Sequence, residues 1–119
     1  MNAKPNLENI CRRVVNSYKK VYGDKIRAIY LYGSYARGDY NEDSDIDFAA
    51  IVEGERMELQ KKRHQVLSET LRMDLEYDII TSPKVIPESD FEKYGEELPY
   101  YRNIRREGKI LAWSDEISA

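Results

Sequence analysis

The sequence is poor in several residue types on which whole classes of protein depend. Its 119 residues include one cysteine and one histidine. A lone cysteine excludes an internal disulfide framework, and a lone histidine with no cysteine nearby argues against a zinc site. No apolar run reaches the length of a membrane-spanning helix and no signal peptide is visible, so we expect no membrane partner. These shortages indicate a protein of the reducing cytoplasm.

Neither sign of charge dominates the chain. It carries 22 acidic and 19 basic residues, for a net charge of −3. This balance argues against a large nucleic-acid-binding face, and the basic pairs at 12–13, 19–20 and 105–106 are explained as solvated helix surface. With 41% hydrophobic residues, the chain has enough apolar side chains for one core. We therefore expect a single domain over residues 1–119, with its folded core at about 7–113.

The chemistry of the chain is concentrated in residues 33–47. An apolar run at 26–32, rich in β-branched and aromatic residues, predicts a strand that ends at Gly33. Gly33 lets the backbone turn sharply or approach a ligand, and Ser34 is a favoured helix N-cap. The free N–H groups at the start of a short helix, next to a hydroxyl, suit a phosphate. Gly38 is placed to end that short helix.

Two aspartates begin the next apolar run. Asp45 and Asp47 lie in residues 45–52, which predict a second strand. Because residues i and i+2 of a strand point to the same face, the two carboxylates should lie side by side. They repel each other unless a proton or a cation intervenes, and Mg²⁺ is usually held by one or two carboxylates plus substrate phosphates. The sequence therefore predicts a phosphate-binding turn and a metal-binding pair close together.

Each of these features also has a plain explanation. A Gly-Ser pair after a strand is usually a turn, and an isolated Asp-x-Asp is often a solvated strand end. The joint pattern is more specific. It resembles the nucleotidyltransferase superfamily related to DNA polymerase β, and more narrowly the minimal nucleotidyltransferases with their Gly-Ser-x10-Asp-x-Asp signature. Gly33, Ser34, Asp45 and Asp47 match that signature, and the resemblance covers roughly residues 25–113.

The rest of the chain alternates between helical and strand patterns. Helices are expected at 6–22, 56–73, 88–94 and from Pro99 to Gly108, a third strand at 75–81, and an edge strand at 110–113. In the second of these helices, Met57, Leu67 and Leu71 are expected to face the core. Pro83 is expected to end the third strand, with 83–87 as a connector. These patterns favour an α/β (α+β) fold, with a small mixed β-sheet and helices packed on it. The resemblance implies the polymerase β-like nucleotidyltransferase fold.

The resemblance also assigns a third acidic residue to the site. The superfamily carries a third carboxylate on a neighbouring strand, before two apolar residues, and Asp78 matches that position. Glu76, which has the same strand parity, is the alternative. Asp45, Asp47 and Asp78 would then be the catalytic residues and would hold two divalent metal ions, with Mg²⁺ expected.

The same resemblance implies how a nucleotide would bind. Gly33 and Ser34 would hold the terminal phosphates of a nucleoside triphosphate, for which ATP is the leading interpretation. Arg37 is placed to contact phosphate, although an exposed salt bridge explains it equally well. The reaction implied is the transfer of a nucleoside monophosphate, AMP in the case of ATP, to an acceptor hydroxyl.

The shortness of the chain bears on the acceptor. Larger relatives add a helical domain that binds an acceptor, whereas small members of the family often pair with a helical toxin of the HEPN class and act as its antitoxin. Some of them transfer AMP to a tyrosine of that partner. We therefore expect an AMP transferase that modifies a HEPN-type partner. Two alternatives stay open: an antitoxin with weak or no catalysis that acts by contact alone, and a transferase for a small-molecule or RNA acceptor.

Overall fold

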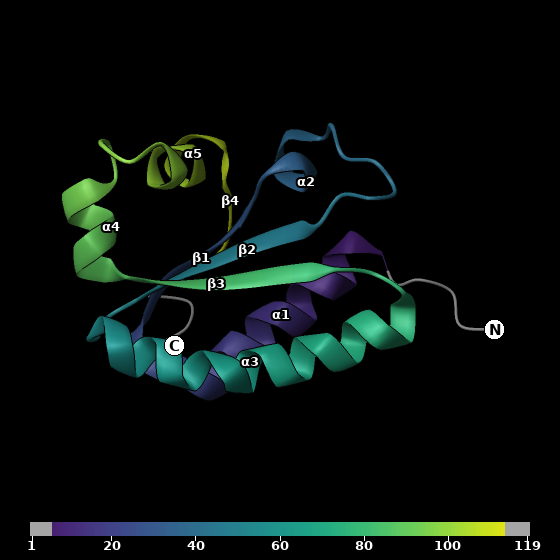
Figure 1. The fold of residues 1–119 in the computed structure, drawn as a ribbon, viewed down its shortest axis with the longest axis horizontal. Coiled ribbons are helices and arrows are strands. Elements are labelled where there is room, and N and C mark those ends of the chain that lie inside the picture. Colours follow the sequence, from purple (N-terminus) through teal and green to yellow (C-terminus); the bar gives the residue numbers. More distant parts are fainter. Residues whose placement is uncertain (1–5, 114–119) are drawn as a thin grey trace.

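Helices and strands alternate along the chain (Figure 1). The computed structural model describes residues 6–113. Its elements, in chain order, are α1 (Leu7–Tyr22), the 3₁₀ turn η1 (Gly23–Lys25), β1 (Ile26–Tyr32), α2 (Ser34–Arg37), β2 (Ile46–Val52), α3 (Arg56–Tyr77), β3 (Thr81–Pro87), α4 (Glu88–Tyr94), α5 (Pro99–Glu107) and β4 (Lys109–Trp113). Among residues 6–113, no helix is long and apolar enough to cross a lipid bilayer.

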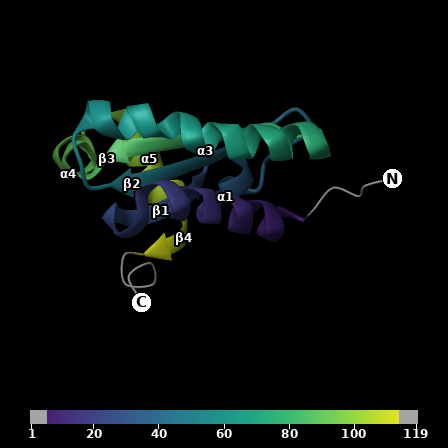
Figure 2. The ribbon, with the colours of Figure 1, turned by 90° about the horizontal axis from the view of Figure 1, so that it is seen from below.

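The four strands form one mixed sheet in the order β3-β2-β1-β4. β1 pairs antiparallel with β2 and with β4, whereas β2 and β3 are parallel. α1 and α3 run beside each other under one face of the sheet, and α4 and α5 lie on the other (Figures 1 and 2). The predicted mixed sheet with packed helices is confirmed, and β4 is the predicted edge strand.

The larger part of the core lies between the sheet and the helix pair α1 and α3. Two tyrosines of α1 anchor this layer through their hydroxyls: Tyr18 donates to the Lys84 carbonyl at 2.7 Å, and Tyr22 donates to the Leu59 carbonyl at 2.6 Å. The bulkiest side chains that are fully buried here are Tyr18, Phe48, Ile29, Ile46 and Met73. A smaller apolar cluster under α4 and α5 consists of Ala28, Tyr32, Ala49, Ile51, Ile86, Phe91 and Ile104.

The first helix begins and ends where the sequence predicts. The side chain of Asn6 accepts a hydrogen bond from the Asn9 N–H at 2.9 Å, as an N-cap residue does. Gly23 follows the last residue of α1 and has a φ of 56°, which few other residues adopt. The expected strand at 26–32 is also confirmed. Local signals therefore determine this part of the chain correctly.

The predicted strand at 75–81 is wrong. α3 continues to Tyr77, and Asp78 ends it in the left-handed conformation, with a φ of 54°. The Asp74 carboxylate then accepts hydrogen bonds from the Thr81 N–H at 3.0 Å and from the Thr81 hydroxyl at 2.9 Å, which fixes the turn into β3. The apolar pattern of this segment is compatible with a strand or with a helix. The Asp74–Thr81 hydrogen bonds stabilise the helix end and the turn that follows it.

The predicted connector at 83–87 is wrong for a related reason, because these residues belong to β3. Proline is tolerated in an edge strand, where its missing N–H deprives no neighbouring strand of a partner. β3 is such an edge, and Arg63 of α3 donates from Nε to the Pro83 carbonyl at 2.8 Å. A side chain therefore replaces the hydrogen bond that another strand would have supplied.

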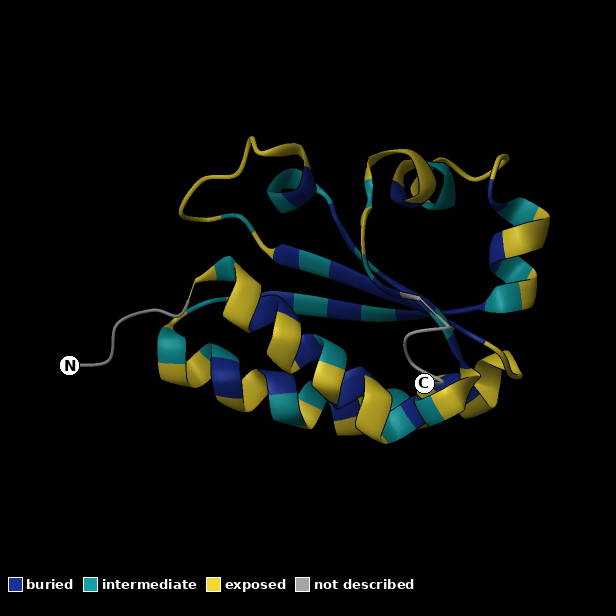
Figure 3. Ribbon diagram, turned by 180° about the vertical axis from the view of Figure 1, so that it is seen from behind, coloured by how far each residue is buried: buried dark blue, intermediate teal, exposed yellow. Residues whose placement is uncertain are grey.

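The inward face of α3 also differs from the prediction. Met57 and Leu71 are 67% and 57% exposed, and Leu67 is half-buried. Figure 3 shows buried, intermediate and exposed positions interspersed along this helix. The residues that α3 buries are Leu59, Val66, Thr70 and Met73. Apolar residues lie on several sides of this 22-residue helix, so its sequence period does not select a face. Packing against α1 and β3 selects it instead.

Two substitutions in α3 test this assignment. Met73→Ala should lower the free energy of unfolding by about 2–5 kcal/mol, because it opens a cavity at a side chain that is 1% exposed. Leu71→Ala, the matched control on the solvent side, should change it by no more than about 0.5 kcal/mol. Urea denaturation followed by circular dichroism measures both values. Equal losses in the two variants would contradict the observed orientation of the helix.

Candidate active site

The candidate site lies where β1 ends and β2 begins. Tyr32, the last residue of β1, pairs with Asp47 of β2, and the chain turns at Gly33 with a φ of 75°. The Asp47 carboxylate lies directly against Gly33: a Cβ at this position would overlap Oδ2 and stand 3.3 Å from Cγ. The Gly-Ser turn and the aspartate strand, separated in the sequence, are therefore in contact. Only glycine leaves room for this approach.

The turn continues into the four-residue helix α2. Gly33 is its N-cap and Ser34 its first residue, so the predicted N-cap role of Ser34 is wrong by one position. The N–H groups of residues 36–37 donate to the Gly33 carbonyl at 3.1 Å. Gly38, with a φ of 89°, ends the helix as predicted. The N–H groups at the start of a helix have no acceptor inside the helix, so they stay available beside Asp47.

Asp47 of β2 and Asp45, which lies just before the strand, interact electrostatically. Asp47 is half-buried, while Asp45 is exposed just before the strand. Burial, and then the charge of Asp45, raise the pKa of Asp47 above its ordinary value of 3.8, and the charges of Lys84 and Arg37 oppose this rise. A divalent cation would relieve the repulsion between the carboxylates. This pair of oxygen donors beside a phosphate-sized turn fits a hard metal ion that also binds substrate phosphates.

The predicted third carboxylate is not part of this pair. Asp78 is exposed at the end of α3, where it lines a cavity of about 830 Å³ together with residues 40–44 of the loop before β2. The residue of β3 that pairs with Asp47 is Ser82. Within residues 6–113, no three acidic, histidine or cysteine side chains are grouped closely enough to hold a metal ion. The structure therefore brings Asp45 and Asp47 together without Asp78.

Glu76, the alternative third carboxylate, lies in α3 and not on a strand. Its carboxylate is 4.0 Å from the guanidinium of Arg13 in α1, in a contact between the two helices under the sheet. Asp47 points to the opposite face, which it shares with Ala49 of the cluster under α4 and α5. Glu76 therefore does not reach the aspartate pair.

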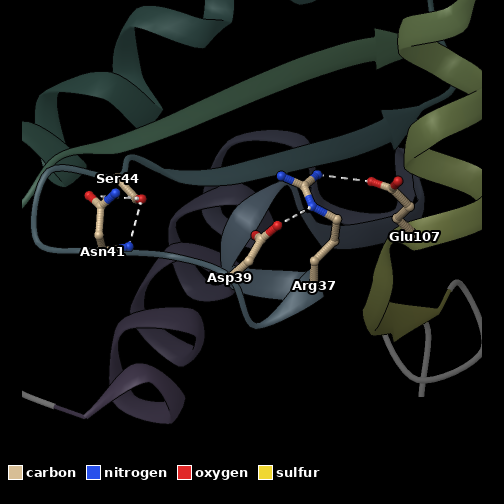
Figure 4. Close-up of polar contacts among 5 residues, drawn as sticks. All are labelled: Arg37, Asp39, Asn41, Ser44 and Glu107. Atoms are coloured by element: carbon tan, nitrogen blue, oxygen red, sulfur yellow. Dashed lines mark hydrogen bonds and ion pairs between the residues drawn. The ribbon is translucent and has the colours of Figure 1, made fainter.

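Arg37 connects α2 with the end of α5 (Figure 4). Its Nε lies 3.2 Å from an oxygen of Asp39, and its Nη1 lies 3.1 Å from an oxygen of Glu107. The salt-bridge alternative for Arg37 is therefore confirmed. The phosphate-contact alternative stays a prediction, although the charge of Arg37 already acts on the Asp47 carboxyl.

The loop before Asp45 is held by its own hydrogen bonds (Figure 4). The Asn41 N–H donates to the Ser44 hydroxyl at 3.0 Å, and the Asp43 N–H donates to the Asn41 side-chain oxygen at 2.8 Å. The Ser44 N–H donates to the Asn41 carbonyl at 3.1 Å. These bonds determine where the chain enters β2 and thus where Asp45 stands.

Comparison with known families identifies the family of the chain. Residues 11–112 match the sequence model of the nucleotidyltransferase domain. The chain belongs to this family. The resemblance to the minimal nucleotidyltransferases is thereby confirmed, and the protein is a nucleotidyltransferase. Gly33, Ser34, Asp45 and Asp47, its signature residues, meet at the junction of β1 and β2.

Two relatives from Methanocaldococcus jannaschii are named as inferred protein adenylyltransferases. One is 35% identical over 96 residues, which are 71% of this chain and 95% of the relative. The other is 32% identical over 106 residues, which are 89% of this chain and 98% of the relative. This nucleotidyltransferase therefore matches nearly the whole length of both relatives.

Two solved structures share the fold. One is a crystal structure of a toxin–antitoxin with AMP-PNP, with a TM-score of 0.53 and 16% identity over 87% of this chain and 73% of the other. The second is a mutant of the toxin–antitoxin MntA–HpeT, with a TM-score of 0.54 and 15% identity over the same shares. At such identities the likeness shows a shared fold alone, and the expected nucleotidyltransferase fold is confirmed by this likeness together with the family match.

The sequence interpretation missed two tyrosines of this nucleotidyltransferase. The hydroxyls of Tyr32 and Tyr100 are 2.9 Å apart, and their rings meet edge to face at 5.9 Å. Burial raises the pKa of Tyr32 well above its ordinary value, as do the hydrogen bond to Tyr100 and the charge of Asp47. Tyr32 could have been found as the strand residue just before the Gly-Ser turn. Tyr100 carried no sequence signal, since α5 is brought over β1 only by the tertiary fold.

The ionisation of Asp47 is directly testable. In a ¹³C NMR titration, its carboxyl should show a pKa above the ordinary 3.8, because it is half-buried beside another carboxylate. Asp45→Asn should lower that pKa toward 3.8 without reaching it, since burial remains. Asp43→Asn, four residues before Asp47, is the matched control and should leave the value unchanged. A titration of Asp47 that does not respond to Asp45→Asn would contradict the proposed coupling.

The approach of Asp47 to Gly33 can be separated from simple backbone strain. Gly38→Ala should cost about 1–2 kcal/mol of unfolding free energy, because its φ of 89° disfavours a side chain, although open space surrounds it. Gly33→Ala should cost more, because a Cβ would also displace the Asp47 carboxylate. Urea denaturation gives the stabilities, and calorimetric titration with AMP-PNP should show weaker binding for Gly33→Ala alone. Equal behaviour of the two variants would refute the contact.

Proposed function

We propose that this nucleotidyltransferase transfers AMP from ATP to a hydroxyl of a partner protein, in a reaction that requires a divalent metal ion. We further propose that the partner is a helical toxin of the HEPN class and that the protein acts as its antitoxin in the cytoplasm. One observation carries the proposal: the Asp47 carboxylate lies against the Gly33 turn. Phosphoryl transfer needs phosphate binding and charge neutralisation at one point, and this contact sets a turn that can bind phosphate beside a carboxylate that can hold a neutralising metal ion.

Each signature residue has a role in this reaction. Gly33 and Ser34 would bind the terminal phosphates through backbone N–H groups and the serine hydroxyl. Asp45 and Asp47 would hold the divalent ion, for which Mg²⁺ is expected. When bound, such an ion neutralises charge on the transferring phosphoryl group. Arg37 stands at the same end of the sheet, and it would contact the triphosphate by exchanging its ion pairs with Asp39 and Glu107 for phosphate oxygens. A metal-binding role for Asp78 stays a prediction.

The transfer itself exchanges one bond for another. The acceptor oxygen bonds to the α-phosphorus of ATP, and the bond from that phosphorus to the oxygen bridging to the β-phosphate breaks. Pyrophosphate leaves, and the proton of the acceptor hydroxyl passes to water. The Gly33 turn orients the leaving phosphates for in-line displacement, as this class of reaction requires.

Two observations on similar proteins support a protein acceptor. The Methanocaldococcus jannaschii relatives, which align over 95% and 98% of their lengths, are named for protein adenylylation. The structures that share the fold are toxin–antitoxin assemblies, one of them with the ATP analogue AMP-PNP. An acceptor hydroxyl supplied by a toxin partner accounts for both.

A second function is favoured by one feature of the site. Ser82, and not a carboxylate, faces Asp47 from β3, and Asp78 stands apart. A site with two carboxylates instead of three supports an antitoxin that neutralises its partner by contact, with weak or no catalysis. The two functions differ in whether Asp47 is needed.

The distinction can be measured by intact-mass spectrometry of the partner encoded beside this protein. After incubation with ATP and Mg²⁺, the partner should gain the mass of one or more AMP units. Asp47→Asn should lower the rate about a hundredfold or more, since charge stabilisation by a bound metal is worth several kcal/mol. Asp43→Asn, the matched control, should retain the rate of the wild type.

Loss of activity in Asp47→Asn should not reflect unfolding. A folded-state pKa raised above 3.8 means that the folded protein binds the Asp47 proton more tightly than the unfolded chain does. Above the folded-state pKa, where Asp47 is ionised, its charge therefore lowers the stability of the folded protein. Asp47→Asn should for this reason be at least as stable as wild type at pH 7. A stable complex without mass gain with any nucleoside triphosphate would overturn catalysis in favour of the contact antitoxin.

A further inference from the structure

A groove beside the site has a distinctive charge. It has a volume of about 260 Å³ and lies along the edge strand β3, between α3 and α5. We call it the β3 groove. Its polar lining consists of Gln60, Arg63, Lys84, Tyr100 and Tyr101. Two of these side chains are cations and none is a carboxylate, although the chain as a whole has a net charge of −3.

The two cations of the β3 groove are not neutralised by the fold. In the described part of the chain, neither Arg63 nor Lys84 has a carboxylate within 4.0 Å. Arg63 is held in place by the hydrogen bond from its Nε to the Pro83 carbonyl, at 2.8 Å. Its two Nη groups donate to no residue among 6–113 and can serve a ligand. Half-buried cations without a carboxylate partner favour an anionic occupant.

The β3 groove adjoins Asp47. Asp47 pairs with Ser82, and Lys84 lies two residues further along β3 on the same face, about 7 Å away along the strand. The groove therefore begins two residues along β3 from the residue that pairs with Asp47.

The β1 side and the β3 side of Asp47 differ in the groups that could bind a substrate. On the β1 side, Tyr32 leads into the Gly33 turn, where the leaving phosphates would bind. In-line displacement requires the attacking oxygen to approach from the side opposite the leaving group. The remaining side is that of β3, where the groove opens. An acceptor that arrives on this side would pass over Lys84 on its way to Asp47.

We infer that the β3 groove binds an acidic segment of the acceptor protein, with carboxylates next to the hydroxyl that receives AMP. This inference rests on the proposed function, because it concerns the acceptor of that same site. Two cations match one or two carboxylates of a peptide. A nucleic acid strand would need a longer basic track, and the basic pairs Arg12-Arg13 and Lys19-Lys20 lie on α1, under the other face of the sheet (Figure 1).

The inference is tested by binding, without ATP, in ¹H–¹⁵N NMR titrations of the full chain. The probes are an eight-residue peptide with one tyrosine flanked by glutamates, the same peptide with glutamines, and an eight-nucleotide single-stranded RNA. The glutamate peptide should shift the amides of 84–86 and 100–101 and the Nε–H of Arg63. It should bind about fivefold more tightly than the glutamine peptide, and less tightly at high salt.

Substitutions assign the preference to the β3 groove. Lys84→Gln should reduce the advantage of the glutamate peptide to about twofold or less. Its ammonium group forms no ion pair with a described carboxylate, so the variant should fold normally. Lys61→Gln, an equal change of charge on the exposed side of α3, is the matched control and should keep the full preference.

Other outcomes would overturn the inference. Equal binding of the two peptides, shifts confined to other surfaces, or an unchanged preference in Lys84→Gln would each exclude an acidic-segment site. Tighter binding of the RNA would assign the groove to a nucleic acid acceptor. The result is independent of the transfer assay. A preference for the glutamate peptide without AMP transfer would support the acidic-segment site and contradict the proposed function. AMP transfer to a partner without that preference would support the proposed function and contradict the acidic-segment site.

Discussion

The approach of the Asp47 carboxylate to the α-carbon of Gly33 is the contact on which the site depends. It requires antiparallel pairing of β1 with β2 in the register that sets Tyr32 opposite Asp47, and it requires a residue without a side chain at position 33. The packing of α1 and α3 under the sheet serves to hold that register. A one-residue slip would turn Asp47 into the apolar layer beneath the sheet, where an ionised carboxylate is costly.

The same contact explains the charges around it. Asp47 is half-buried beside Asp45, so it is ionised only against opposition from burial and from a like charge. Arg37 stands on the side of the turn and Lys84 on the side of β3, and both favour the ionised form. The positive charges are therefore distributed on the two sides from which a triphosphate and an acceptor would approach. Arg37 and Lys84, which stabilise the ionised form of Asp47, are thus the same residues that would meet the two substrates.

The parts of the site that could be predicted are those that depend on neighbours in the chain. Gly33 and Ser34 follow a strand pattern directly, and the next strand pattern places Asp47, whereas Asp45, predicted as the first residue of that strand, lies just before β2. Asp78 could not be placed in this way, because α3 extends further than its pattern shows and the Asp74–Thr81 hydrogen bonds shift the start of β3. Register between distant strands has no local signal.

The sequence by itself determined the family, the Gly-Ser turn, the aspartate pair and most boundaries of helices and strands, because caps, turns and strand period act over a few residues. Only the tertiary structure decided which face of α3 is buried, that Pro83 lies within an edge strand, and that Ser82 faces Asp47. It also brought the Tyr100 hydroxyl to Tyr32 and the Arg63 side chain to β3 from distant helices. These outcomes arise from packing between segments far apart in the chain, which local pattern does not encode.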